Sequence, residues 1–191
     1  MNNRKIESDF QLDKLFEIDI MDEISDEESD EIFYELVYSV GWMMMVFNSL
    51  DGLISHCMDK GLDPQERRSE INYLLISEMS YSQKVNFVIR NFGLLIYNDA
   101  RFEDMKDDLE KLEQNLKQSG TLRNRYAHAD FGIILKGHYI KVKTKPKRNG
   151  VFHDYMRFEK GDLEADIKFV GQTRDSLEEF EEKFWNRIFS S

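Results

Sequence analysis

The segment Leu122–His128 brings together side chains of the types that can cleave RNA without a metal ion. Such cleavage needs a base for the 2′-hydroxyl proton, an acid for the departing 5′-oxygen and a fixed positive charge beside the phosphate. A histidine titrates near neutrality and can fill either proton role. An arginine stays charged and offers a fork of donors that matches phosphate oxygens. Arg123 and His128 therefore supply the residue types for metal-independent phosphodiester cleavage.

The spacing within this segment determines which of its polar side chains could act together. On a helix, Asn124 and His128 are four residues apart and share a face. Arg123 lies about 140° of helical rotation from His128, so only its long side chain could reach the same point. Asn124 would then orient His128 or hold a phosphate oxygen.

The same segment resembles the signature of HEPN domains, an Arg and a His with four to six residues between them. Arg123 and His128 match it with four residues between them, and Asn124 is the polar residue that often follows the Arg. A Leu precedes the Arg and an Ala precedes the His, as in that family. Upstream, residues 82–85 (Ser-Gln-Lys-Val) are similar to the Gln-Lys segment that opens a core helix in several HEPN branches. The resemblance covers roughly residues 25–191, by the order of elements more than by identity.

This resemblance implies a metal-independent endoribonuclease of prokaryotic defence or toxin type. It also implies a homodimer in which two copies of the motif face each other across a cleft. The chemistry gives a separate reason for the pairing, because one chain has a single motif histidine whereas the reaction needs both a base and an acid. Two His128 side chains could divide these roles while both Arg123 groups stabilise the phosphorane. RNA is the expected substrate because DNA lacks the attacking hydroxyl.

Control by a partner protein is also expected, but one known route does not fit. In a branch of the family that is paired with nucleotidyltransferase antitoxins, a Tyr follows the His by two residues and is modified. Here that position is Asp130, so modification by this route is doubtful, although Tyr126 lies inside the motif. An antitoxin or another regulatory partner remains an expectation.

The distribution of charge bears on whether RNA can bind. The net charge of −11 by itself argues against a nucleic-acid partner. Residues 1–31 hold twelve acids and three bases, however, so residues 32–191 carry only −2. Residues 131–150 contain six bases and no acid, which would suit a surface that follows phosphates. A solvated, positively charged loop is the alternative reading. The predicted RNA-binding residues are Lys141, Lys143, Lys145, Lys147 and Arg148.

Length and cysteine content limit the class of protein. The 191 residues suit an acidic N-terminal segment over residues 1–24, disordered or docked, and one domain over residues 25–191. A single Cys57 excludes a disulfide framework and favours a reducing compartment. We expect no run long and apolar enough to span a membrane, and a cytoplasmic location. No H-x3-H or C-x2-C spacing and no Gly-rich phosphate loop occurs, so neither a metal nor a cofactor is expected.

Apolar residues at three- and four-residue steps predict a mainly α fold. Helices are expected to begin at Ser25, near Asp63, at Ser80 and after Asp99. The first of these is apolar nearly all round, with Trp42, Met43 and Val46 off its main stripe. Such a helix should be buried on more than one side, in a bundle interior or a subunit interface. The predicted core stripe comprises Phe33, Leu36, Val37, Val40, Met44, Phe47 and Ile54.

Signals in the second half of the chain predict a break and then strands. Residues 119–121 (Ser-Gly-Thr) are expected to interrupt the fourth helix, so that Thr121 caps a short helix carrying the motif. Alternation over residues 138–142 and a turn at Asn149-Gly150 predict a small β-hairpin, or a three-strand meander if a strand begins at Ile133. A last helix follows Gly161. The predicted fold is an antiparallel up-and-down, HEPN-like helical bundle with a hairpin inserted before the last helix.

Two other functions fit the same sequence. The bundle could be a non-catalytic binding or sensor module that acts with a partner protein or a nucleotide. Arg123 would then pair with the acids of a neighbouring helix, such as Asp107 or Glu110, and His128 would cap the motif helix. The chain could also be a small effector that its acidic head or a partner keeps inactive.

Overall fold

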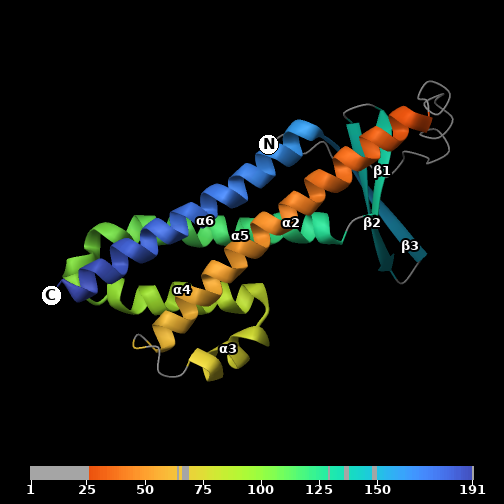
Figure 1. Cartoon of the computed structure of the whole chain (residues 1–191). Coiled ribbons are helices and arrows are strands. Elements are labelled where there is room, and N and C mark those ends of the chain that lie inside the picture. Colours follow the sequence, from red (N-terminus) through yellow and green to blue (C-terminus); the bar gives the residue numbers. More distant parts are fainter. Residues whose placement is uncertain are drawn as a thin grey trace. The chain divides into compact units, whose positions relative to one another are not determined.

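The computed structural model describes residues 26–63, 65, 69–128, 130–135, 138–147 and 150–190. Over these residues the chain is mainly helical, which confirms the predicted class (Figure 1). It divides into two compact units. Unit 1 comprises Met1–Met43 and Asn124–Asp166, and unit 2 comprises Met44–Arg123 and Ile167–Ser191. Three helices have residues in both units: α2 (Asp26–Leu62), α5 (Lys106–Ala127) and α6 (Lys160–Phe189).

Unit 2 is helical and has an aromatic and aliphatic core. Besides its parts of α2, α5 and α6, it contains α3 (Ser69–Ser77), α4 (Tyr81–Ile96) and the 3-10 helix η1 (Ala100–Met105). The Phe92 ring of α4 lies 4.7 Å from the Phe184 ring of α6, centroid to centroid. The buried residues that α2 contributes follow three- and four-residue steps, as expected for one helix face. They are Phe47, Leu50, Ile54, Cys57 and Met58.

Local polar signals set where two of these helices begin. At the start of α4, the backbone N–H of Ser80 donates to Gln83 Oε1 at 2.8 Å, as the predicted capping box requires. At the start of η1, Asp99 Oδ1 accepts from the backbone N–H of Arg101 at 3.0 Å. The predicted start of the second helix near Asp63 falls largely on residues 64 and 66–68, which lie outside the described residues, and α3 is described from Ser69.

The predicted break before the motif is wrong, because α5 runs unbroken through residues 119–121. The hydroxyls of Ser119 and Thr121 donate to the carbonyls of Asn115 and Lys117, four residues earlier, at 2.9 and 3.1 Å. Hydroxyls bonded in this way lie within a helix and do not cap one. Gly120 also has a packing role, since a Cβ there would lie 2.7 Å from the Tyr81 ring.

Unit 1 contains a three-stranded antiparallel sheet in the order β1-β2-β3. Its strands are β1 (Asp130–Leu135), β2 (His138–Lys147) and β3 (Gly150–Glu159). Tyr139 of β2 pairs with Phe158 of β3, and both side chains are buried. The Phe158 ring lies 6.2 Å from that of Tyr126, so the sheet packs on the end of α5.

The part of α2 that belongs to unit 1 buries only part of the predicted stripe. Met43, expected off the core stripe, is fully buried, whereas Phe33 is 52% and Val37 51% exposed. Leu36 is buried as predicted, together with Ile32 and Met43. A helix that is apolar all round carries no single stripe, so its neighbours decide which face is covered.

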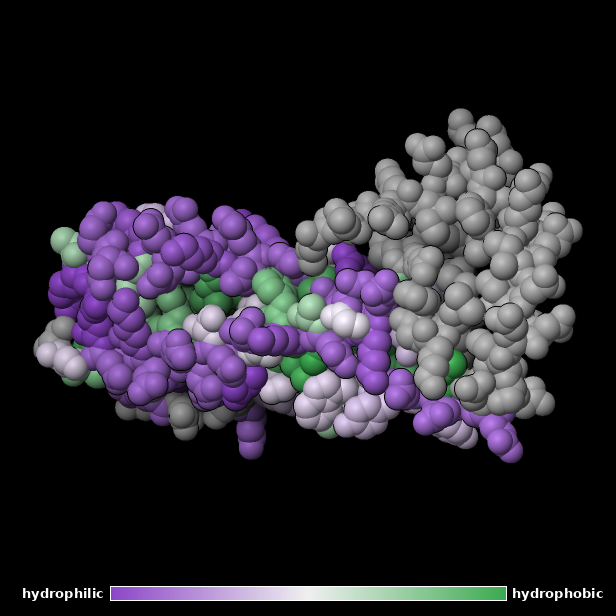
Figure 2. Space-filling view, turned by 90° about the horizontal axis from the view of Figure 1, so that it is seen from above, coloured by the Kyte–Doolittle hydropathy of each residue, from purple (hydrophilic) through white to green (hydrophobic). Residues whose placement is uncertain are grey.

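We expected no stretch able to span a membrane, but one helix is long and apolar enough to do so, by length and composition alone. Residues Asp30–Leu62 within α2 pass that test, with a mean hydropathy of 1.2. Only 22% of the 18-residue window concerned is buried. One such helix carries little weight, since core helices of soluble proteins meet the same criterion. In the coloured part of Figure 2, hydrophilic side chains cover most of the surface, with hydrophobic side chains visible between them.

Candidate functional site

The motif occupies the last turns of α5 and the residue that follows this helix. Leu122, in unit 2, and Tyr126, in unit 1, are four residues apart and both buried, so this part of the helix is packed within each unit. Asn124 and His128, which belong to unit 1, are exposed. The two predicted site residues of unit 1 are therefore accessible on a helix end that its buried neighbours fix in place.

A buried carboxylate of α6 holds the motif helix within unit 1. Asp166, 5% exposed, accepts a hydrogen bond from the Tyr126 hydroxyl at 2.7 Å. The same Oδ2 accepts from Arg125 Nη1 at 3.2 Å. Burial, together with the hydrogen bond to Asp166, raises the pKa of Tyr126 above its usual range, so the hydroxyl stays protonated and donates. Arg125 and Tyr126 thus serve to position the motif.

Sequence reasoning missed Asp166, although a signal for it exists. It lies three residues after Leu163 and four before Val170, both buried positions of α6. An acid on the apolar face of a helix must have a polar or cationic partner, because an unpaired buried charge is strongly destabilising. That rule predicts a partner for Asp166 but cannot say which residue supplies it.

Arg123 belongs to unit 2 and lies on an aromatic ring. Its guanidinium carbon is 5.9 Å from the centroid of the Phe47 ring, within the range of a cation–π contact. The Phe47 ring in turn lies 4.7 Å from that of Tyr81, whose hydroxyl donates to the carbonyl of Leu116 at 2.9 Å. The Arg123 guanidinium therefore lies beside a packed pair of aromatic rings.

The predicted RNA-binding residues fall mostly on one strand. Lys141, Lys143, Lys145 and Lys147 all lie on β2 of unit 1, for which the structure describes the backbone. Arg148 lies outside the described residues.

A metal site and a reactive cysteine are less well supported as centres of chemistry. Among the described residues, no group of three or more His, Cys, Asp or Glu side chains could hold a metal ion. Burial raises the pKa of the Cys57 thiol to about 12, so this cysteine is protonated at neutral pH and a poor nucleophile.

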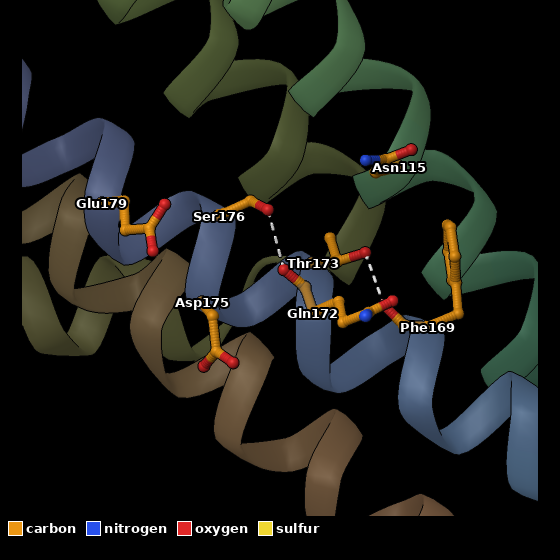
Figure 3. Close-up of a pocket in the computed structure, with 7 residues that line it drawn as sticks. All are labelled: Asn115, Phe169, Gln172, Thr173, Asp175, Ser176 and Glu179. Carbon is orange, nitrogen blue, oxygen red and sulfur yellow. Dashed lines mark hydrogen bonds between the residues drawn. The ribbon is translucent and has the colours of Figure 1, made fainter.

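A depression of about 420 Å³ lies in unit 2, where Asn115 of α5 faces six residues of α6 (Figure 3). The two hydroxyls that line it both donate to backbone carbonyls of α6 itself. Thr173 donates to the carbonyl of Phe169 at 2.9 Å, and Ser176 to that of Gln172 at 2.8 Å. This depression offers no nucleophile next to a base, so it does not compete with the motif as a reaction site.

Comparison of the chain with protein-family models, with curated proteins and with solved structures found no match.

Proposed function

We propose that the protein is a metal-independent endoribonuclease, a toxin or antiviral-defence effector built on an HEPN-like antiparallel helical bundle with a β-hairpin before the last helix. The observation that carries the proposal is the contrast within the motif. Leu122 and Tyr126 are buried, while Asn124 and His128 on the same helix end are exposed. A polar site held rigid by buried neighbours is what positioned proton transfer requires.

In the proposed mechanism, two chains contribute one motif each to a composite site. One His128 takes the proton from the 2′-hydroxyl, which attacks the phosphorus, and the His128 of the second chain protonates the departing 5′-oxygen. The products are a 2′,3′-cyclic phosphate and a 5′-hydroxyl. Asn124 orients the imidazole or holds a phosphate oxygen.

The fixed positive charge is assigned to Arg123 rather than Arg125. Arg125 pairs with the buried carboxylate of Asp166, so its charge is neutralised within the protein. Arg123 would stabilise the charge that develops on the phosphorane oxygens. The lysines of β2 and Arg148 would hold the RNA backbone, in a cytoplasmic protein controlled by a partner.

Purified protein incubated with structured RNA in excess EDTA tests the proposal. We expect Arg123→Ala and His128→Ala each to lower the cleavage rate by about 10²–10⁴-fold, because each removes a group that acts in the transition state. Arg90→Ala, which removes an exposed arginine from α4, should keep the full rate. RNA with a 2′-deoxy sugar at the cleaved position should resist. Equal rates for the wild type and the His128 variant, or a need for a divalent metal, would contradict this function.

One observation favours the non-catalytic alternative. The Arg123 guanidinium lies over the Phe47 ring, and an arginine in that position can be structural. If the bundle only binds or senses, expression of the wild type and of His128→Ala should be equally harmless to the host. Toxicity of the wild type that the substitution removes would support the endoribonuclease instead.

A further inference from the structure

Unit 2 has a long groove that the proposed reaction does not use. It has a volume of about 960 Å³ and is lined by residues of α2 and α3 and by Lys84 of α4. Its α2 wall extends from Asn48 to Asp59, with lining residues at three- and four-residue steps. At 1.5 Å per residue this face is roughly 16 Å long, the length of three helical turns.

A buried ion pair makes one end of the groove rigid. Lys84, 8% exposed, donates to Asp51 Oδ2 at 2.8 Å and to Ser55 Oγ at 3.1 Å. These bonds tie the start of α4 to α2, and further along, Asn72 Nδ2 of α3 donates to Asp59 Oδ1 at 2.9 Å. Both ends of the groove are thus fixed by side-chain bonds between its helices.

The α3 wall presents large apolar side chains to solvent. Tyr73 and Leu74 line the groove and are 73% and 66% exposed. Small-molecule sites enclose about 70–90% of the surface of their ligand. Walls as exposed as these could not enclose a small ligand to that extent. An open groove with an apolar wall on α3 and a polar wall on α2 suits instead an amphipathic helix docked along it.

The charge of the lining selects the kind of helix. Three carboxylates line the groove, those of Asp51, Asp59 and Glu70, against the single ammonium of Lys84 and the imidazole of His56. The lining is therefore acidic, and residues 44–123 and 167–191, which make up unit 2, hold 18 acids and 14 bases, a net charge of −4. The negative electrostatic potential of this lining attracts a basic partner and repels an acidic one.

We infer that this groove binds a basic amphipathic helix of a partner protein, with apolar residues against Tyr73 and Leu74 and Lys or Arg residues against the acidic lining. This inference goes beyond the proposed nuclease activity and does not depend on it. The groove lies wholly in unit 2, and His128 in unit 1.

Fluorescence anisotropy of the full chain with labelled 18-residue peptides tests it. The first peptide has leucines on one helical face and lysines elsewhere, the second replaces each lysine by glutamate, and the third has the first composition in scrambled order. We expect the basic amphipathic peptide to bind at least tenfold more tightly than either of the others. Equal affinity for the scrambled peptide would overturn the inference, because it would show attraction to net charge alone.

Matched substitutions locate the binding. Leu74→Glu should weaken binding of the basic peptide at least tenfold, since it puts a charge on the apolar wall. Leu75→Glu is the control, because Leu75 is 61% exposed on the same helix but does not line the groove. It should change affinity less than threefold. Equal losses in the two variants would show that the peptide does not bind in the groove.

A second pair of variants tests the acidic lining without changing the apolar wall. Glu70→Lys should weaken binding of the basic peptide several-fold, whereas Glu78→Lys, an exposed position outside the lining, should have less effect. Both variants change the net charge by the same amount, so a difference between them reports position. No difference would overturn the assignment of the acidic lining as the contact.

Discussion

The Tyr126 hydroxyl and the Asp166 carboxylate form a contact that holds the motif helix in unit 1. Both groups are buried, and their hydrogen bond measures 2.7 Å. Tyr126→Phe removes only the hydroxyl and leaves the bond from Arg125 to Asp166, at 3.2 Å, in place. We expect the free energy of unfolding to fall by about 1–3 kcal/mol, the usual effect of losing a bond to a buried charged group. Urea denaturation at pH 7 measures it.

The control for this variant is Tyr97→Phe, which removes an exposed hydroxyl that lies 3.4 Å from Glu110. It should change the free energy of unfolding by less than ~0.5 kcal/mol. The pKa of Tyr126 in the folded protein is raised above its ordinary value of 10.0. The Tyr126 hydroxyl therefore makes its full contribution to the free energy of unfolding below pH 10, and this contribution is lost as the pH rises further. The gap between the wild type and Tyr126→Phe should narrow above pH 10, and a constant gap would contradict this account.

Single residues differ in how far the sequence could predict them. The segment from Arg123 to His128 could be selected because its chemistry lies within six consecutive residues. The role of Arg125 could not, because it depends on Asp166, which lies 41 residues away in another helix. A short motif identifies candidate groups, but only tertiary contacts show which arginine is already paired.

At the scale of elements, the continuity of α5 depends on how Gly120 packs. A Cβ at this position would lie 2.7 Å from the Tyr81 ring. That ring cannot easily move, because it packs on Phe47 at 4.7 Å and its hydroxyl is bonded to Leu116. Gly120→Ala should therefore destabilise the protein by about 1–3 kcal/mol, as overpacking does, despite the better helix propensity of alanine.

Gly41→Ala is the matched control within α2, since a Cβ there meets nothing within 4 Å. It should stabilise the protein by about 0.5–1 kcal/mol, because alanine loses less backbone entropy in a helix. Thermal unfolding followed by circular dichroism measures both variants. Similar shifts for Gly120→Ala and Gly41→Ala would show that the Tyr81 contact does not matter.

Helix starts could be predicted from sequence where a polar side chain bonds its own first turn, as at Ser80 and Asp99. The residues around Gly120 resemble a helix end in sequence, but their hydroxyls bond backward and the glycine fits against Tyr81. The buried face of α2 could be predicted only in part. Leu36, Phe47 and Ile54 are buried as expected, but Phe33 and Val37 are exposed, because apolar residues lie nearly all round the helix. At Gly120 and along α2, tertiary packing rather than the local sequence determines whether the helix continues and which side chains are buried.

At the scale of the whole molecule, α2 exposes an apolar surface among the described residues of unit 1. We call Phe33, Tyr34, Val37, Tyr38 and Trp42 the α2 stripe. Its four aromatic residues are between 46% and 74% exposed. With roughly 150–250 Å² per aromatic side chain, their exposed area is on the order of 360–600 Å². Patches of this size on a soluble protein usually mark an interaction site.

Pairing of two α2 stripes would give the proposed dimer a suitable interface. It would bury roughly 700–1,200 Å² from the aromatic residues alone, approaching the ~1,200–2,000 Å² of stable complexes once other contacts are added. A two-fold axis makes such a surface self-complementary. We therefore expect light scattering at micromolar concentration to report about twice the chain mass of 22.8 kDa.

Variants of the α2 stripe connect assembly with activity. Tyr38→Glu and Trp42→Glu should give monomers, because each places a charge in the apolar contact. Leu94→Glu, at an equally exposed apolar position of α4, should remain a dimer. If the site is composite, the monomeric variants should lose RNA cleavage although Arg123 and His128 are intact, since base and acid would no longer meet. A monomer that cleaves RNA at the full rate would show that one chain supplies both proton carriers, and the assignment of the acid to a second His128 would then be wrong.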